Sequence, residues 1–119
     1  MNHVAKDAHQ LAGKLKALAD ETRLQMALLL TAHAELCVCD FEHALGISQS
    51  KASRHLHYLL NTGLVDDRRE NVWIYYRLAD DLEPALQNIL ASVTAALDPD
   101  VLPLLDAQLQ RWLETRTCD

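Results

Sequence analysis

The chain has 119 residues, half of them hydrophobic, and a formal net charge of −6 at pH 7. This length predicts one small domain over residues 1–119, with a core that oligomerisation would help to stabilise. No apolar run is long enough to cross a membrane, and residues 1–7 lack the apolar core of a signal peptide, so we expect a cytoplasmic protein without membrane contact. The acidic balance argues against a general nucleic-acid coat protein.

The N-terminal third is predicted to form two helices. Apolar residues spaced three and four apart from Val4 to Leu18 predict the first helix. Asp20 is a suitable N-cap for a second helix that continues to about Ala32. Residues 35–37 are then expected to form a short strand or an extended link.

Residues 40–62 are predicted to form a helix-turn-helix. A short helix over 40–45 would end at Gly46. Ser48 would cap a second helix over 49–61, which Gly63 would close. No acidic residue lies between Glu42 and Asp66, so this stretch is locally basic within an acidic chain. Such a distribution suits a protein that binds specific DNA sites.

The outer face of the helix over 49–61 carries residue types that read DNA. Glutamine and serine both donate and accept hydrogen bonds, arginine can pair with guanine or phosphate, and lysine and N-terminal amides suit phosphate. A solvated polar face is the alternative, and only the neighbouring turn and wing make the pattern specific. The predicted DNA contacts on this helix are Gln49, Ser50, Lys51, Ser53, Arg54 and His57.

Residues 64–78 are predicted to form a β-hairpin wing. Residues 64–65 and 72–78 have the β-branched and aromatic composition of strands, and the polar residues 66–71 are expected at the tip. Arg68 and Arg69 are candidates to enter a minor groove or to bind phosphate. An exposed, salt-bridged turn is the alternative.

The C-terminal third is predicted to form two more helices. Asp81 would cap the first, with Pro84 in its first turn, and Asp98-Pro99 would start the second, which runs to about Thr115. The predicted helices in segments 1–19 and 81–116 have more apolar surface than one small winged-helix domain can bury. This favours a homodimer that buries the surface between two copies over a monomeric core. The expected fold is mainly α with a small β-hairpin wing: a winged helix-turn-helix, dimeric through its terminal helices.

Three cysteines form an odd count, which favours reduced thiols over a disulfide scaffold. Cys37 and Cys39 directly precede the helix-turn-helix, where helix N-terminal amides favour thiolates. Thiolates prefer soft ions, and trivalent arsenic and antimony favour three sulfurs. Cys118, a partner subunit's cysteine or an exogenous thiol could supply the third. Alternatively, one or both of the pair are core cysteines. Two nearby histidines are either accessory ligands or surface residues: His33 and His43.

Four segments resemble the ArsR/SmtB family of metal-sensing repressors, specifically its arsenic-responsive branch. They are residues 18–24, 35–40, 48–56 and 73–78, in unbroken order. The resemblance implies a winged-helix homodimer that binds double-stranded operator DNA and is released by arsenic(III) or antimony(III), without an organic cofactor. It assigns Cys37 and Cys39 to the inducer, and it assigns four side chains to the major groove: Gln49, Ser50, Ser53 and Arg54.

The thiol segment departs from the family's arsenic sensors at one position. These sensors place a third cysteine three residues after the second, where this chain has Glu42. Since related members take ligands from elsewhere in the chain, Cys118 is the candidate third ligand. Cadmium and lead sensors share a similar motif but add N-terminal cysteines, and none precedes Cys37, which disfavours that branch.

Two further interpretations remain open. The thiols could form a redox or persulfide switch, with Cys37 or Cys39 paired to Cys118. The chain could also be a winged-helix dimerisation module without a DNA target, as some methyltransferases carry. An enzyme is not expected, because the chain is short and shows no nucleophile–base or Gly-rich phosphate signature.

Overall fold

A computed structural model describes residues 3–115. It is mostly helical with one three-stranded antiparallel sheet, and it confirms the predicted winged helix-turn-helix. The elements in chain order are α1 (His3–Leu18), α2 (Glu21–Ala32), β1 (Leu36–Cys37), α3 (Val38–Leu45), α4 (Gln49–Thr62), β2 (Val65–Glu70), β3 (Trp73–Leu78), α5 (Pro84–Ala96) and α6 (Val101–Thr115).

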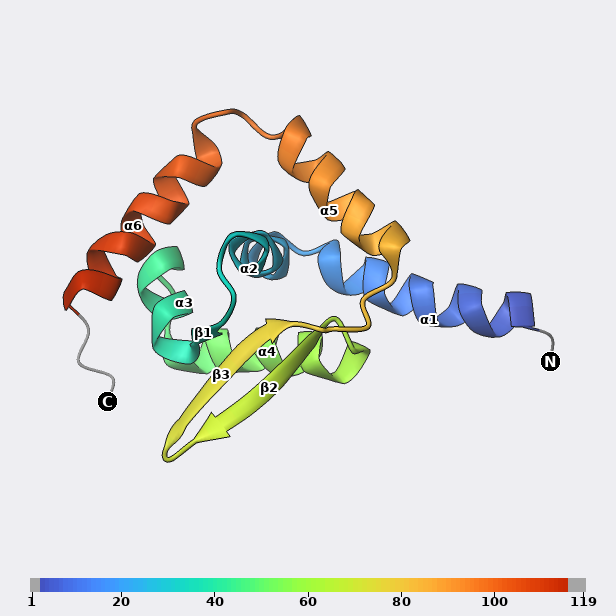
Figure 1. Ribbon diagram of the computed structural model, residues 1–119, viewed down its shortest axis with the longest axis horizontal. Helices are drawn as coiled ribbons and strands as arrows, with labels where there is room; N and C mark the ends of the chain where they lie inside the picture. The colour runs from blue at the N-terminus through green and yellow to red at the C-terminus, as the bar shows by residue number, and fades with distance from the viewer. Residues whose placement is uncertain (1–2, 116–119) are drawn as a thin grey trace.

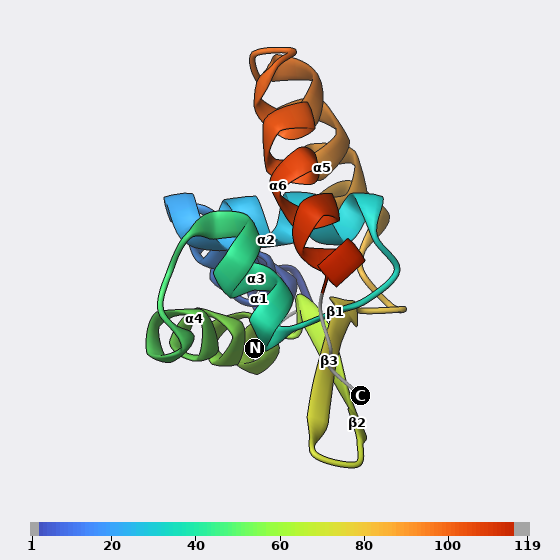
Figure 2. The same ribbon diagram turned by 90° about the vertical axis from the view of Figure 1, so that its left-hand side faces the viewer.

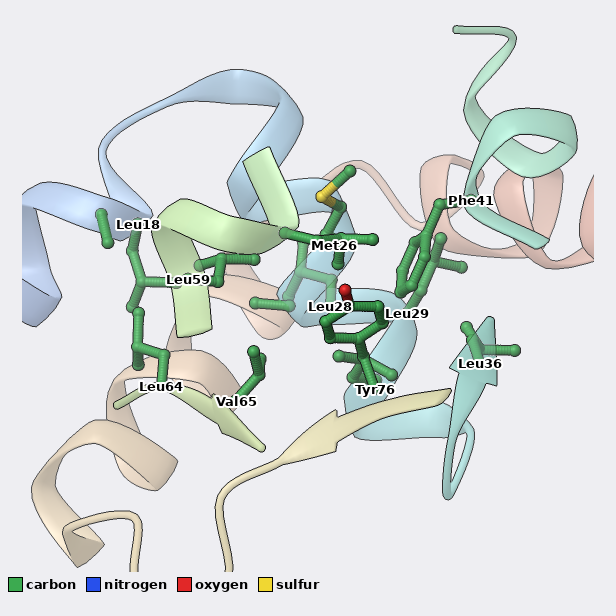
Figure 3. Packing of buried hydrophobic residues seen from close by; sticks show 14 of the residues in the cluster. Leu18, Met26, Leu28, Leu29, Leu36, Phe41, Leu59, Leu64, Val65 and Tyr76 are labelled. Carbon is green, nitrogen blue, oxygen red and sulfur yellow. The ribbon is translucent and has the colours of Figure 1, made fainter. Parts of the chain in front are cut away.

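Helix α2 lies at the centre of the domain, with α5 and α6 arching over one side and α4 and the wing on the other (Figure 1). Five consecutive α2 residues, from Met26 to Leu30, are buried. A helical segment that is apolar on all sides must be covered by other elements on all sides. Buried residues of α1, α3, α4, β3, α5 and α6 belong to the same core cluster. Phe41, Leu59 and Tyr76 come to this core from α3, α4 and β3 (Figure 3).

Four predicted helix ends are confirmed. The Asp20 side chain caps α2 by accepting the N–H three residues later at 3.0 Å, and Ser48 caps α4 in the same way at 3.1 Å. Gly46 and Gly63 end α3 and α4 with φ of 65° and 84°. Glycine adopts this left-handed backbone conformation without steric strain from a side chain, so both helices of the helix-turn-helix end at these positions.

Three predicted helix starts were wrong. Helix α3 begins at Val38 rather than at residue 40, because Asp40 occupies the third helical position and its carboxylate binds back to the N-cap. The N-cap of α5 is Glu83, not Asp81, since Pro84 takes the first helical position. Helix α6 begins at Val101 rather than at residue 99, because Asp98 accepts the N–H two residues later in a turn before the helix.

The predicted wing tip was also wrong. Residues 66–70 belong to β2, which pairs with β3 as far as Glu70 opposite Trp73, so the turn contains only Asn71 and Val72. A two-stranded ribbon exposes much of its surface, so acidic and basic residues are compatible with a strand there. The hairpin projects away from the helices (Figure 2). Of the two predictions for the segment before α3, the short strand is confirmed: it is β1, which pairs with β3 and makes the third strand of the sheet.

Within the described residues 3–115, no single helix is long and apolar enough to cross a membrane. Helices α5 and α6 meet the length and composition criteria only as a pair, and the chain bends by 101° between them.

Candidate thiol site and nucleic-acid interface

Cys37 and Cys39 lie where the sheet joins the first helix of the helix-turn-helix. Cys37 is both the last residue of β1 and the N-cap of α3, and its backbone lies opposite Tyr75 of β3. Cys39 follows in the first turn of α3. Cys37 is only 1% exposed, whereas Cys39 is half-buried. A ligand that draws the two sulfurs together would therefore act on the wing and on α3 at once.

Asp40 holds this turn in place from inside the protein. The residue is fully buried, and its Oδ2 accepts the backbone N–H of Cys37 at 2.8 Å. Cys37 and Asp40 form a capping box in which the cysteine sulfur takes the place of the usual serine or threonine hydroxyl. The conformation of the thiol turn is thus coupled to the start of α3.

Helix α6 contacts the same turn, a feature that the sequence analysis missed. Trp112 Nε1 donates to Asp40 Oδ1 at 2.8 Å. The indole also stacks on His43 of α3, with ring centroids 3.6 Å apart and planes within 5° of parallel. The Asp40 carboxylate is therefore held between the thiol segment and α6. The available signal was Trp112 itself, because an indole N–H that packs against a protein core needs a hydrogen-bond acceptor there.

The described residues contain no group of three or more His, Cys, Asp or Glu side chains placed to hold a metal ion. His43 stacks on α6, and His33 Nε2 lies 2.6 Å from Asp106 Oδ1 of the same helix. Both histidines therefore contact α6, and His43 is exposed. Cys118, the predicted third ligand, lies outside the described residues.

The outer face of α4 presents the predicted DNA-reading side chains. Ala52, Leu56 and Leu59 are buried, so the opposite side of the helix is turned outward. Ser53 is half-buried, and five of the predicted residues are exposed: Gln49, Ser50, Lys51, Arg54 and His57. The structure therefore brings all six to the accessible side of the helix.

His55 is a basic residue of α4 that serves the packing instead. Its Nδ1 lies 3.2 Å from Arg23 Nη1, and burial lowers the pKa of His55 below its ordinary value. Arg23 also donates to the Ala17 carbonyl at 2.7 Å and lies 3.9 Å above the ring of Tyr58. This cluster anchors α4 to the junction of α1 and α2.

The two wing arginines differ in their surroundings. Arg68 forms ion pairs with Glu35 and Glu70 and lies above the Tyr75 ring. The hydrogen bond from Arg68 holds the pKa of Glu35 below its ordinary value. Arg69 is exposed and forms no ion pair with a described residue. The salt-bridged alternative thus describes Arg68, although it lies on a strand rather than in the turn, while Arg69 is the more accessible cation.

A cavity of about 220 Å³ lies between the thiol pair and the predicted DNA-reading face of α4. Both cysteines line it, together with α4 residues of the predicted DNA-reading face and aromatic and aliphatic residues of β3. The thiols and the proposed DNA-reading surface therefore border one space.

The profile for bacterial regulatory proteins of the arsR family matches residues 20–67. The arsenic resistance transcriptional regulator ArsR1 of Pseudomonas putida is 44% identical over 95 residues, which are 76% of this chain and 74% of that protein. The cadmium resistance transcriptional regulatory protein CadC homolog of Staphylococcus aureus is 41% identical over 71 residues, 60% of this chain and 59% of that protein.

Among solved structures, the homodimeric winged helix-turn-helix DNA-binding domain Mb0332 of Mycobacterium bovis has a TM-score of 0.67 at 34% identity. The match covers 81% of this chain and 85% of that one. Fold and relatives agree: the chain belongs to the ArsR family of bacterial transcriptional regulators, which are DNA-binding proteins and not enzymes.

Proposed function

We propose that this chain is a homodimeric repressor that binds operator DNA and releases it when trivalent arsenic or antimony binds Cys37 and Cys39. The observation that carries the proposal is the place of the thiol pair, at the junction of β1 and α3. The similarity to a regulator named for arsenic resistance supports the choice of inducer.

The junction offers a route from inducer to DNA. Arsenic bound to both sulfurs would pull Cys37 away from its capping geometry with Asp40 and shift the start of α3. Helix α3 packs against α4, so the recognition helix would move with it. A coupling free energy of about 1–3 kcal/mol is typical of such allosteric links and corresponds to roughly 5- to 150-fold in DNA affinity.

Exposed apolar residues on the terminal helices support a dimer. Leu15 of α1 is 43% exposed, and Leu104 of α6 is 65% exposed. Burying such residues against a second copy is favourable, and a two-fold dimer would present two recognition helices to two half-sites. Similarity to a homodimeric domain points the same way.

Cys118 is the proposed third sulfur for inorganic arsenic. Only two residues separate it from Thr115, the last residue of α6, and α6 contacts the thiol turn through Trp112. The proposed third thiol therefore follows closely after the helix that contacts the thiol turn.

Fluorescence anisotropy tests the proposal on a DNA duplex that the protein itself selects from a random-sequence library. We expect salt-sensitive binding to the duplex and its reversal by arsenite in the wild type. The Cys37→Ser/Cys39→Ser variant should bind the duplex normally and stay bound when arsenite is added. Release of this double variant at wild-type arsenite concentrations would show that the thiol pair is not the sensor.

A soft-metal repressor that responds to cadmium or lead is the second candidate, favoured by the similarity to a cadmium resistance regulator. Cadmium and lead chlorides in the same anisotropy assay distinguish the two candidates. Release by cadmium or lead at concentrations below those needed for arsenite would favour the second.

A further inference from the structure

The cavity beside the thiols is partly lined by apolar side chains of the wing. Its volume is about 220 Å³, and β3 and the turn before it contribute Val72, Trp73 and Ile74 to the lining. An apolar protein cavity of about 150 Å³ is large enough to bind benzene. The thiol pair therefore borders a space that can take an apolar group of the size of a methyl or phenyl substituent.

The number of ligands present suits one class of arsenic compound. Arsenite, As(OH)₃, exchanges three hydroxyls for three thiols and releases three waters. A monoorgano-arsenic(III) compound, R–As(OH)₂, exchanges only two: R–As(OH)₂ + 2 Cys–SH → R–As(S–Cys)₂ + 2 H₂O, with no change of oxidation state. The described residues offer two sulfurs here and no group of three ligating side chains.

We propose that this cavity is the binding site for the organic substituent of a monoorgano-arsenic(III) compound whose arsenic is held by Cys37 and Cys39. The inference rests on the proposed function, in which these two thiols hold arsenic. The carbon substituent replaces the third arsenic ligand, so this complex needs no contribution from Cys118. Apolar surface of the substituent is removed from water against the wing side chains, which favours binding.

Occupation of the cavity has a direct consequence for DNA. Gln49, Ser53 and His57, spaced four apart on α4, line the same space and belong to the face proposed to read the major groove. A substituent between α4 and β3 contacts these side chains from the protein side. Organoarsenicals therefore disturb the reading surface itself, in addition to displacing α3.

The test compares arsenite, methylarsonous acid and phenylarsonous acid as releasing agents for the bound duplex, without added thiol. Ile74→Trp is the cavity-filling variant, and Ile74→Ala is the matched variant that enlarges the cavity. Both must first bind the duplex as the wild type does. We expect Ile74→Trp to raise the phenylarsonous acid concentration for half-release at least tenfold while leaving arsenite unchanged, and Ile74→Ala to leave both nearly unchanged.

Cys118→Ser supplies a second, independent readout. This variant should keep its full response to phenylarsonous acid, and the compound should protect two thiols of the wild type from a thiol reagent and leave one reactive. Equal effects of Ile74→Trp on arsenite and phenylarsonous acid, no effect on either, or loss of the organic response in Cys118→Ser would overturn the cavity proposal. In each of these cases release of the wild type by arsenite would leave the proposed function standing. If no arsenical releases the wild type, both proposals fail.

Discussion

Trp112→Phe removes one hydrogen bond that joins α6 to the thiol turn. In the wild type, Asp40 accepts from Trp112 Nε1 on one oxygen and from the Cys37 N–H on the other. Phenylalanine retains an aromatic ring to stack on His43 but cannot donate to Asp40. The buried carboxylate then keeps one of its two described donors and no longer links the two segments.

The expected loss follows from the burial of the acceptor. A hydrogen bond to a charged group contributes about 1.5–3 kcal/mol, and a buried group cannot replace a lost bond with one to water. Asp40 is fully buried, so we expect a destabilisation in that range. Against a typical total stability of about 5–15 kcal/mol, this is a readily measured fraction.

Urea denaturation followed by circular dichroism measures the effect at one fixed protein concentration, because the stability of the proposed dimer would depend on concentration. Gln110→Ala is the matched control, since Gln110 is an exposed residue of the same helix, and its effect should stay within about 0.5 kcal/mol. A Trp112→Phe change of similarly small size would refute the view that α6 holds the thiol turn through Asp40.

Three further predictions concern the dimer, the DNA contacts and pH. Leu15→Glu should place a charge on the exposed apolar surface of α1 and yield a monomer by light scattering, whereas a persistent dimer would exclude α1 from the interface. Arg54→Ala should weaken duplex binding by about 1–3 kcal/mol. Arg68→Ala should change it less, because Arg68 is already paired with Glu35; the reverse order in a binding titration would reject this assignment. Burial lowers the pKa of His55 in the folded state, so protonation of His55 favours the unfolded chain. The contribution of neutral His55 to stability is therefore complete above the unfolded-state pKa of about 6.5. It is lost as pH falls through the lower folded-state pKa. His55→Gln should reduce the fall in the free energy of unfolding as pH drops below about 6.5. Urea denaturation at several pH values measures this, and a fall equal to that of the wild type would contradict the prediction.

The parts of the fold that were predictable depend on local sequence. Ser48 and Gly46 determine helix ends through their own hydrogen bonds and backbone preferences, so the helix-turn-helix could be placed without its neighbours. The same holds for the outer face of α4, because helical spacing determines which residues point away from Ala52 and Leu56.

Contacts between distant segments were not predictable in this way. The Trp112–Asp40 hydrogen bond joins residues 72 apart, and the Arg68–Glu35 ion pair joins residues 33 apart. Nothing in either local pattern specifies its partner, because the packing of α6 and of β1 brings these side chains together. The cavity beside the thiols arises for the same reason, because β1, α3, α4 and β3 come together only in the folded chain.

The most direct test of the thiol switch follows arsenite binding and DNA release in one titration. Near-ultraviolet absorbance reports sulfur–arsenic bonds while anisotropy reports the bound duplex, and each signal is recorded for the wild type and for Cys37→Ser. We predict that the two wild-type curves coincide and that Cys37→Ser loses both signals over the same arsenite range. Release without sulfur–arsenic absorbance, or normal release of Cys37→Ser, would contradict the account.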